Sequence, residues 1–384
     1  MNVELAIIGG TVVDPDSGST YLADIGISDG KIVAIDRSRA GTLDSAEKVD
    51  ATGRFVLPGI VDSHVHVYEH VMPSSLNADA IGIRQGVCAV IDAGSFGPGN
   101  AAGFGAYIVK PSTTHVYGLV NISRNGVSGS PGEGEVLGFL NPNQVARTLA
   151  KFPAWAVGVK ARASVTAAGL LGIMSTQLSK QAARESGVPL MVHIGNAPPT
   201  LDDVANLLTA GDLMTHCFHG KIGGMITRQG AVLPAVAAAI DRGVLLDVGH
   251  GSGSFAWDTA EKALALRTPP HIISTDLHTG CINGPAYSMV KTMSKFLHLG
   301  MSLVDVARAS STAPANAFGL GDKYGRVAVG FPANLSIVEH VNRTETMWDV
   351  EKQSRVVTGV LEARHAILDG VVHTADPDAT VGRL

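Results

Sequence analysis

LPGIVDSHVH, residues 57–66, is an apolar stretch that ends in two histidines separated by one residue. Residues two apart in a β-strand project from the same face, so His64 and His66 can offer both imidazoles to one ion. Two histidines with structural roles would look the same, and the pair alone is a weak indication of a metal site. The stretch predicts a buried strand that carries candidate ligands at its carboxyl end.

Seven further apolar runs follow this strand, mostly separated by segments with helical character such as 143–151, 201–210 and 231–242. The eight runs cover residues 55–67, 87–94, 114–123, 156–163, 189–195, 213–220, 244–251 and 271–278. Strands that alternate with helices predict a parallel sheet, and eight of them favour a (β/α)8 barrel of the TIM type. An open doubly wound sheet stays possible, because the sequence does not show whether the eighth run meets the first.

Both ends of the chain have a different pattern, in which short runs alternate apolar and polar residues around a turn. The turns are Asp29-Gly30 and Asp369-Gly370, and Asp-Gly is a typical β-hairpin connection. A lone hairpin is only marginally stable in water, so we expect the two ends to pair into one small β-sandwich. The predicted domains are a barrel at 55–325 and a discontinuous β-sandwich made of 1–54 and 326–384.

The composition excludes several classes of partner. The formal net charge is −5 and the chain has no run of basic residues, which argues against nucleic-acid binding. It shows no export leader, and no apolar run reaches the roughly 18 residues of a membrane span, so we expect a cytoplasmic protein without a membrane partner. Its three cysteines are widely spaced, which fits buried reduced thiols better than disulfides.

Other residues able to bind a metal also follow apolar runs. They are Lys160, His193, His216 and Asp276. In α/β barrels the carboxyl ends of the strands form the active site, so these four residues and the histidine pair are expected at one rim. Six candidate ligands make a metal site a much stronger prediction than the pair alone.

Lys160 needs a separate chemical argument. Burial and two nearby dications would both lower its pKa, because each disfavours the ammonium form. A neutral amine can add carbon dioxide, and the resulting carbamate is anionic and able to bridge two metals. The competing interpretation is a lysine that extends to solvent or pairs with a carboxylate.

These residues, in this order, resemble those of the amidohydrolase superfamily, in its binuclear branch that includes dihydroorotases and hydantoinases. The segment 326–335, RVAVGFPANL, is similar to the stretch at which such enzymes return to the sandwich. The resemblance implies one metal held by His64, His66 and Asp276, a second held by His193 and His216, and carboxylated Lys160 between them. It implies two divalent ions, zinc by preference for imidazole and carboxylate ligands. Asp276 would take a proton from the attacking water and pass it to the leaving group.

Further residues are candidates to contact a small-molecule substrate. They are Tyr68, Arg162, His219, Arg228, His250 and His278. The two arginines could clamp a carboxylate, whereas the histidines could equally support ligands or loops. Tyr68 stands where dihydroorotases carry an arginine, so dihydroorotate is a doubtful substrate. The glycine-rich 249–254 is interpreted as a loop rather than a phosphate cradle.

The sequence more closely resembles a subgroup of predicted deacetylases, which implies cleavage of the acyl C–N or C–O bond of a small acylated carboxylate. A cyclic-amide hydrolase would use the same metals and stays an alternative. A mononuclear deaminase would normally manage without Lys160, and a non-catalytic scaffold relative would be expected to have lost ligands. Analogy with the family also predicts a homo-oligomer.

Overall fold

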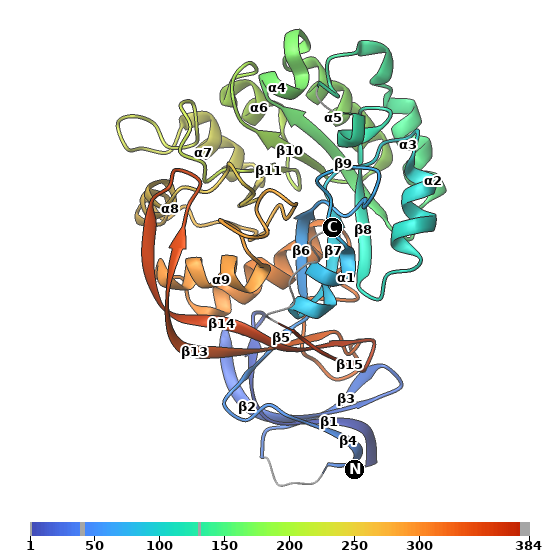
Figure 1. The fold of residues 1–384 in the computed structure, drawn as a ribbon, viewed down its shortest axis with the longest axis vertical. Helices are drawn as coiled ribbons and strands as arrows, with labels where there is room; N and C mark the ends of the chain where they lie inside the picture. The colour runs from blue at the N-terminus through green and yellow to red at the C-terminus, as the bar shows by residue number, and fades with distance from the viewer. Residues whose placement is uncertain (1, 39–42, 130–131, 377–384) are drawn as a thin grey trace.

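The barrel sheet is continuous and parallel. The computed structural model describes residues 2–38, 43–129 and 132–376. Seven strands lie side by side in the order in which they occur along the chain (Figure 1). They are β6 (Ile60–Val65), β7 (Val87–Asp92), β8 (His115–Asn121), β9 (Ala156–Ala163), β10 (Leu190–Ile194), β11 (Leu213–Thr215) and β12 (Leu245–Asp247). β6 and β7 are buried at every residue, as strands covered on both faces must be.

The eighth run closes this sheet without forming a regular strand. Ile272 forms a parallel bridge to Asp247 at the end of β12, and Leu277 forms another to Val65 at the end of β6. The peptide N–H of His66 donates to the carbonyl of Leu277 at 3.0 Å. Segment 271–278 therefore touches both edges of the sheet, which answers the question that the sequence left open and favours the barrel over an open sheet.

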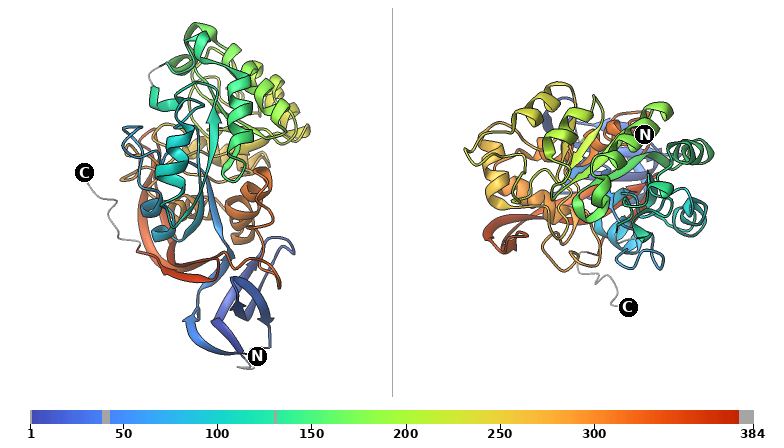
Figure 2. Two further views of the ribbon diagram at one scale, coloured as in Figure 1. Left: turned by 90° about the vertical axis from the view of Figure 1, so that its right-hand side faces the viewer. Right: turned by 90° about the horizontal axis from the view of Figure 1, so that it is seen from above.

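Helices connect the strands and lie outside them (Figure 2). They are α1 (Ala78–Ile81), α2 (Ala101–Phe104), α3 (Pro142–Lys151), α4 (Val165–Ala168), α5 (Met174–Ser186), α6 (Leu201–Leu207), α7 (Pro234–Asp241), α8 (Trp257–Ala265), α9 (Met289–His298), α10 (Leu303–Ala307) and α11 (Ala313–Ala317). The helical segments predicted from the sequence coincide with α3, α6 and α7. The start of α6 is fixed by a capping box between Thr200 and Asp203.

The two chain ends share a second, mixed sheet below the barrel in Figure 1. Its strands are β1 (Asn2–Asp14), β2 (Ser19–Ser28), β3 (Lys31–Asp36), β4 (Asp44–Asp50), β5 (Phe55–Pro58), β13 (Leu335–Trp348), β14 (Ser354–Leu368) and β15 (Val371–Thr374). β5 pairs with β1 on one side and with β13 on the other, which joins the two ends. The expected first barrel strand is thus split at Gly59, since β5 belongs to this sheet and β6 begins the barrel.

Both predicted hairpin turns are present. Asp29 and Gly30 have φ values of 50° and 69°, and Asp369 and Gly370 have φ values of 50° and 84°. Two successive positive φ values are typical of the type I′ turn, which explains the Asp-Gly pairs. Residues 377–384 of the predicted second part of the sandwich lie outside the described residues.

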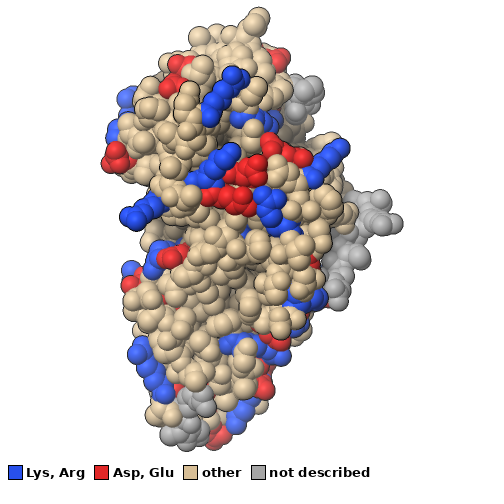
Figure 3. Space-filling model, turned by 90° about the vertical axis from the view of Figure 1, so that its left-hand side faces the viewer, with Lys and Arg blue, Asp and Glu red and all other residues tan. Residues whose placement is uncertain are grey.

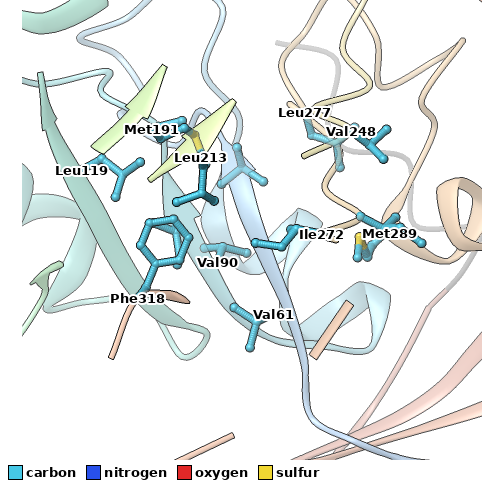
Figure 4. Close-up of a cluster of buried hydrophobic side chains, with 14 of the residues drawn as sticks. Val61, Val90, Leu119, Met191, Leu213, Val248, Ile272, Leu277, Met289 and Phe318 are labelled. Carbon is cyan, nitrogen blue, oxygen red and sulfur yellow. The ribbon is translucent and has the colours of Figure 1, made fainter. Parts of the chain in front are cut away.

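The barrel core lies directly below the candidate ligands. Figure 4 shows side chains from strands around the barrel that point toward one another, among them Val61, Val90, Leu119, Met191 and Leu213. Burial of such side chains is the main favourable contribution to folding. Met191 also accepts a hydrogen bond from Lys160 at its Sδ atom, 3.2 Å from Nζ, so the core extends up to the site.

The surface carries charges of both signs. On the face shown in Figure 3, basic and acidic side chains lie next to one another in a band across the middle, and most of the remaining surface is uncharged. Among the described residues, no helix has the length and apolar character needed to cross a membrane.

Candidate metal centre

All six predicted ligands lie at the carboxyl ends of barrel strands and line one cavity. They are His64, His66, Lys160, His193, His216 and Asp276. His64, Lys160 and His193 lie on β6, β9 and β10. His66 and His216 directly follow β6 and β11, and Asp276 lies within the eighth segment. The cavity has a volume of about 310 Å³, at the small end of the range for ligand sites. The fold thus brings together residues that are far apart in the sequence.

Three of these residues form a tight cluster. The Nε2 atoms of His64 and His66 lie 3.4 and 3.2 Å from Oδ1 of Asp276. One ligand atom from each of the three residues lies within 4.8 Å of the others. Two imidazoles and a carboxylate around a common point suit a divalent transition metal.

The second pair of histidines stands beside this cluster. The ring centroids of His193 and His216 are 4.4 Å apart, and the His216 ring is 5.0 Å from that of His64. Burial holds the pKa of His64, His193 and His216 well below the usual value. Neutral imidazole is the form that binds a metal, so these side chains are ready to act as ligands.

Hydrogen bonds to the other ring nitrogen orient three of the imidazoles. Nδ1 of His64 lies 2.9 Å from Thr215 Oγ1, and Nδ1 of His66 lies 2.8 Å from Ser95 Oγ. Nδ1 of His216 donates to the carbonyl of Gly249 at 2.6 Å. In each case Nε2 is left for another partner, which is the usual arrangement around a metal.

Buried carboxylates form a layer behind the ligands. Asp62 accepts from the peptide N–H of Thr275 at 3.1 Å, next to Asp276, and burial raises its pKa to about 7. Asp92 accepts from the N–H of Val67 at 2.8 Å, beside His66. Asp247 Oδ2 lies 3.7 Å from His64 Nδ1. The sequence analysis did not assign these aspartates a role, although Asp62 lies in the LPGIVDSHVH stretch.

Lys160 is buried and poorly solvated. Its Nζ atom lies 3.1 Å from His64 Nε2 and 3.2 Å from Met191 Sδ, and the thioether is a weak acceptor. Burial lowers its pKa to about 7, although Asp276 and Asp247 oppose this effect. A substantial fraction of the amine is therefore neutral near pH 7, which is the form that can add carbon dioxide.

Two of the ligands have a strained backbone. His216 and Asp276 have φ values of 75° and 49°, which non-glycine residues rarely adopt. The nearby loop is adapted to them: a Cβ atom on Gly251, which has φ 50°, would lie 2.3 Å from Asp276 Oδ2. The glycine-rich segment 249–254 therefore lets the backbone approach the ligands closely, which agrees with its interpretation as a loop.

Asp276 is ionised in this setting. Burial raises its pKa, but the surrounding imidazoles, His64 first, together with a hydrogen bond from His66 outweigh burial and hold the pKa well below the usual range. His278 follows it, with Nδ1 donating to the Asp276 carbonyl at 2.7 Å and Nε2 lying 3.3 Å from Ser252 Oγ. Asp276 is thus a carboxylate that can accept a proton.

Of the predicted substrate contacts, Arg162 and His278 line the cavity. Tyr68, His219, Arg228 and His250 are absent from the described lining residues. Tyr68 donates to the carbonyl of Asn100 at 3.0 Å. Their predicted contact with a substrate gains no support from the geometry.

Histidines 219 and 250 bind neighbouring parts of the fold. Nδ1 of His219 accepts from the peptide N–H of Lys221 at 3.1 Å. Nε2 of His250 lies 2.7 Å from Nζ of the buried Lys295, and its ring stacks on Phe255. Arg228 is exposed in the loop between β11 and α7. The two histidines match the supporting role that the sequence analysis kept open.

The sequence analysis missed several polar residues that line the cavity. They are Ser74, Ser164, Thr166, Asn196, Lys221, Ser252 and Ser254. Position after an apolar run could have drawn attention to Ser164 and Asn196, which closely follow β9 and β10. Lys221, Ser74, Ser252 and Ser254 lie in longer loops, where the spacing of residues gives no comparable signal.

The residues present fit a pair of divalent ions, because buried imidazoles, a carboxylate and a lysine with a lowered pKa converge on one point. The Nε2 atoms of His64 and His66 both lie toward Asp276 within this cluster. A barrel with such residues at its strand ends defines a hydrolase of the metal-assisted type. Residues 55–363 match the Amidohydrolase family, and the chain belongs to this family. It is a hydrolytic enzyme.

Relatives and solved structures agree with this assignment. A deacetylase of Agrobacterium fabrum is 33% identical over 346 residues, which cover 88% of this chain and 84% of the relative. A crystal structure of an adenine deaminase has a TM-score of 0.91 and 33% identity, covering 97% of this chain and 100% of that one. A crystal structure of a dihydroorotase has a TM-score of 0.88 and 30% identity, with 97% and 99% covered.

Proposed function

We propose that this enzyme removes an acyl group, acetyl in the simplest case, from a small molecule by hydrolysis of an amide or ester bond. The observation that carries the proposal is the convergence of His64, His66 and Asp276 beside Lys160 and the His193–His216 pair. The similarity to a deacetylase along most of both chains supports the choice of reaction. The small cavity supports a small substrate.

Two divalent ions, zinc by preference, are part of the proposal. His64, His66 and Asp276 would hold one and His193 with His216 the other, with carboxylated Lys160 between them. When bound, such ions would polarise the substrate carbonyl and activate water. The chain itself contributes buried, neutral imidazoles in fixed orientations and a lysine whose pKa near 7 favours carbamate formation.

The proposed proton carrier is Asp276. As an ionised carboxylate it can accept a proton when water attacks the acyl carbon and release that proton to the departing nitrogen or oxygen. The adjacent imidazole of His278 is fixed by the Asp276 carbonyl and reaches Ser252, so it can orient the substrate without replacing Asp276.

A cyclic-amide hydrolase is the second candidate, favoured by the likeness to a dihydroorotase structure at 30% identity. Both reactions would use the same six residues, so the shape and charge of the cavity decide between them. A mononuclear deaminase has less support despite the likeness to an adenine deaminase, because Lys160 would have no role in it. The complete ligand set argues against a non-catalytic scaffold.

The test is an activity screen of the metal-loaded protein. The panel contains both enantiomers of N-acetyl amino acids and O-acetyl hydroxy acids. It also contains hydantoin, dihydrouracil, dihydroorotate and adenine. We expect turnover of acetylated compounds, at least a hundredfold loss in Lys160→Ala, and no change in the matched control Lys262→Ala on the surface of α8. Turnover of cyclic amides alone would establish the second candidate, and turnover of adenine alone would contradict both.

Two further predictions concern the cellular compartment and the oligomeric state of the enzyme. Cys88, Cys217 and Cys281 are free and buried, which supports action in a reducing compartment such as the cytoplasm. Mass spectrometry of intact protein isolated under thiol-blocking conditions would test this. The homo-oligomer stays a prediction, which sedimentation can check.

A further inference from the structure

Three cationic side chains and one carboxylate lie among the described residues that line the active-site cavity. The cations are Lys160, Arg162 and Lys221, and the carboxylate is Asp276. Lys160 and Asp276 belong to the candidate metal centre. Outside the metal centre, Arg162 and Lys221 are therefore the lysine and arginine side chains of this described lining that could bind an anionic substrate group.

Arg162 already has a carboxylate partner. Its Nη1 atom donates to both oxygens of Glu133, at 3.0 and 3.2 Å. The Glu133 side chain is 3% exposed and that of Arg162 is 22% exposed, so the pair is shielded from solvent. Two opposite charges at this distance leave little net field in the cavity, and removing one would leave the other buried and unpaired. Arg162 is therefore a poor candidate for an anion anchor.

Lys221 is in a different situation. Within the described parts of the chain, no hydrogen bond or ion pair is assigned to its ammonium group. The residue is exposed, yet burial of part of its side chain lowers its pKa, which means that the ammonium is partly desolvated. A cation in such a position gains more from an anionic partner than one that is fully hydrated.

The backbone of Lys221 is held by a buried histidine, and its ammonium lies near a second loop. The peptide N–H of Lys221 donates to Nδ1 of His219, whose side chain is buried, at 3.1 Å. On the opposite side, Nζ lies 3.9 Å from the position that a Cβ atom on Gly253 would occupy. Ser252 and Ser254 flank this glycine and also line the cavity. The ammonium thus faces the loop that approaches Asp276.

We propose that Lys221, rather than Arg162, binds the carboxylate of an acylated acid. This inference rests on the proposed function, since it places the acyl group at the candidate metal centre and the carboxylate beside Lys221 in the same cavity. The volume of about 310 Å³ fits a short acid, such as an N-acyl α-amino or O-acyl α-hydroxy acid. His219 acts as a positioning residue for the loop.

The test compares each acetylated acid with its carboxamide, which has nearly the same shape but no charge. We expect the wild type to prefer the carboxylate, and Lys221→Met to reduce this preference in kcat/KM about 10- to 100-fold, mainly through KM. Lys221→Arg should retain most of the preference, and the control Lys262→Met all of it. An unchanged preference in Lys221→Met would overturn the proposal.

A binding measurement separates this proposal from the proposed function. Titration calorimetry of the metal-loaded protein with lactate and glycolate, which have no acyl group to lose, reports anion binding whether or not acylated acids turn over. Weaker binding by tenfold or more in Lys221→Met, with unchanged circular dichroism, supports the assignment even if hydrolysis were absent and the proposed function wrong. Equal binding in both proteins, or no binding of any of these acids to the wild type, would overturn it.

Discussion

Replacing Lys160 with methionine should stabilise the protein when no metal is bound, although it should abolish catalysis. The lysine is buried, and among the described residues its Nζ atom forms hydrogen bonds with an imidazole nitrogen and a thioether alone. Methionine has a similar length and carries no charge, so it removes the cost of burying the ammonium. The variant protein would then be more stable but inactive, which is a known trade-off between stability and activity.

The size of this effect follows from the pKa. The value for Lys160 falls from 10.5 to about 7 because of burial. At 1.36 kcal/mol for each pKa unit, the folded state is penalised by about 4 kcal/mol at pH 7, where the buried amine is half protonated. Local relaxation reduces this figure, so we expect a gain of about 2–4 kcal/mol in the free energy of unfolding.

The pH dependence has a definite sign. Well above pH 10.5 the lysine is neutral in both the folded and the unfolded state and contributes nothing. As the pH falls toward 7, Lys160 binds a proton in the unfolded chain but stays mostly neutral in the folded protein, so the free-energy penalty on the folded state grows. Below about pH 7 this penalty is constant. The advantage of Lys160→Met should therefore shrink to about 1 kcal/mol at pH 10.

Urea unfolding of chelator-treated protein measures this difference. Buffers free of carbon dioxide prevent carbamate formation, and Lys262→Met serves as the matched surface control. A variant that is less stable than wild type at pH 7, or a gain that is as large at pH 10 as at pH 7, would show that the lysine is not a strained ammonium. The argument for its carboxylation would then lose its physical basis.

Three other perturbations address the metal centre. Asp276→Asn should lower kcat by a factor of about 10² to 10⁴ with little change in circular dichroism, and near-normal turnover would exclude Asp276 as the proton carrier. Gly251→Ala places a methyl group 2.3 Å from Asp276 Oδ2 and adds strain at φ 50°. We expect it to destabilise the protein by about 1–3 kcal/mol and to lower its metal content, which mass spectrometry measures. A variant with full metal content would contradict the close approach. Prolonged dialysis against a chelator should remove two metal ions per chain and all activity, and added zinc should restore both. Lys160→Ala should bind zinc less tightly than the wild type. A single ion in the active wild type would refute the two-metal site.

Much of the fold could be predicted because each strand leaves a local signal. β6 and β7 appear as uninterrupted apolar runs, and the two Asp-Gly pairs mark turns that need positive φ values. The eighth segment is apolar too, but its irregular backbone depends on contacts with both edge strands. A local pattern shows that a segment is buried and does not show how it pairs.

The ligands could be predicted for the same reason, since they end or follow apolar runs, whereas their surroundings could not. Glu133, which neutralises Arg162, lies in a loop 29 residues earlier in the chain. Lys295, which binds His250, comes from α9. Such pairs are created by tertiary structure alone, and they decide whether a charged or titratable side chain faces the cavity or is used within the fold.

The position of β5 between β1 and β13 has a consequence for biosynthesis. As the nascent chain leaves the ribosome, β1 to β5 emerge first, and β13 is translated only after the entire barrel. Until then β5 has an open edge of backbone donors and acceptors, which is a template for pairing with other chains. Interrupted translation should therefore yield fragments prone to aggregation, and completion of β13 to β15 is the step that seals this edge (Figure 1).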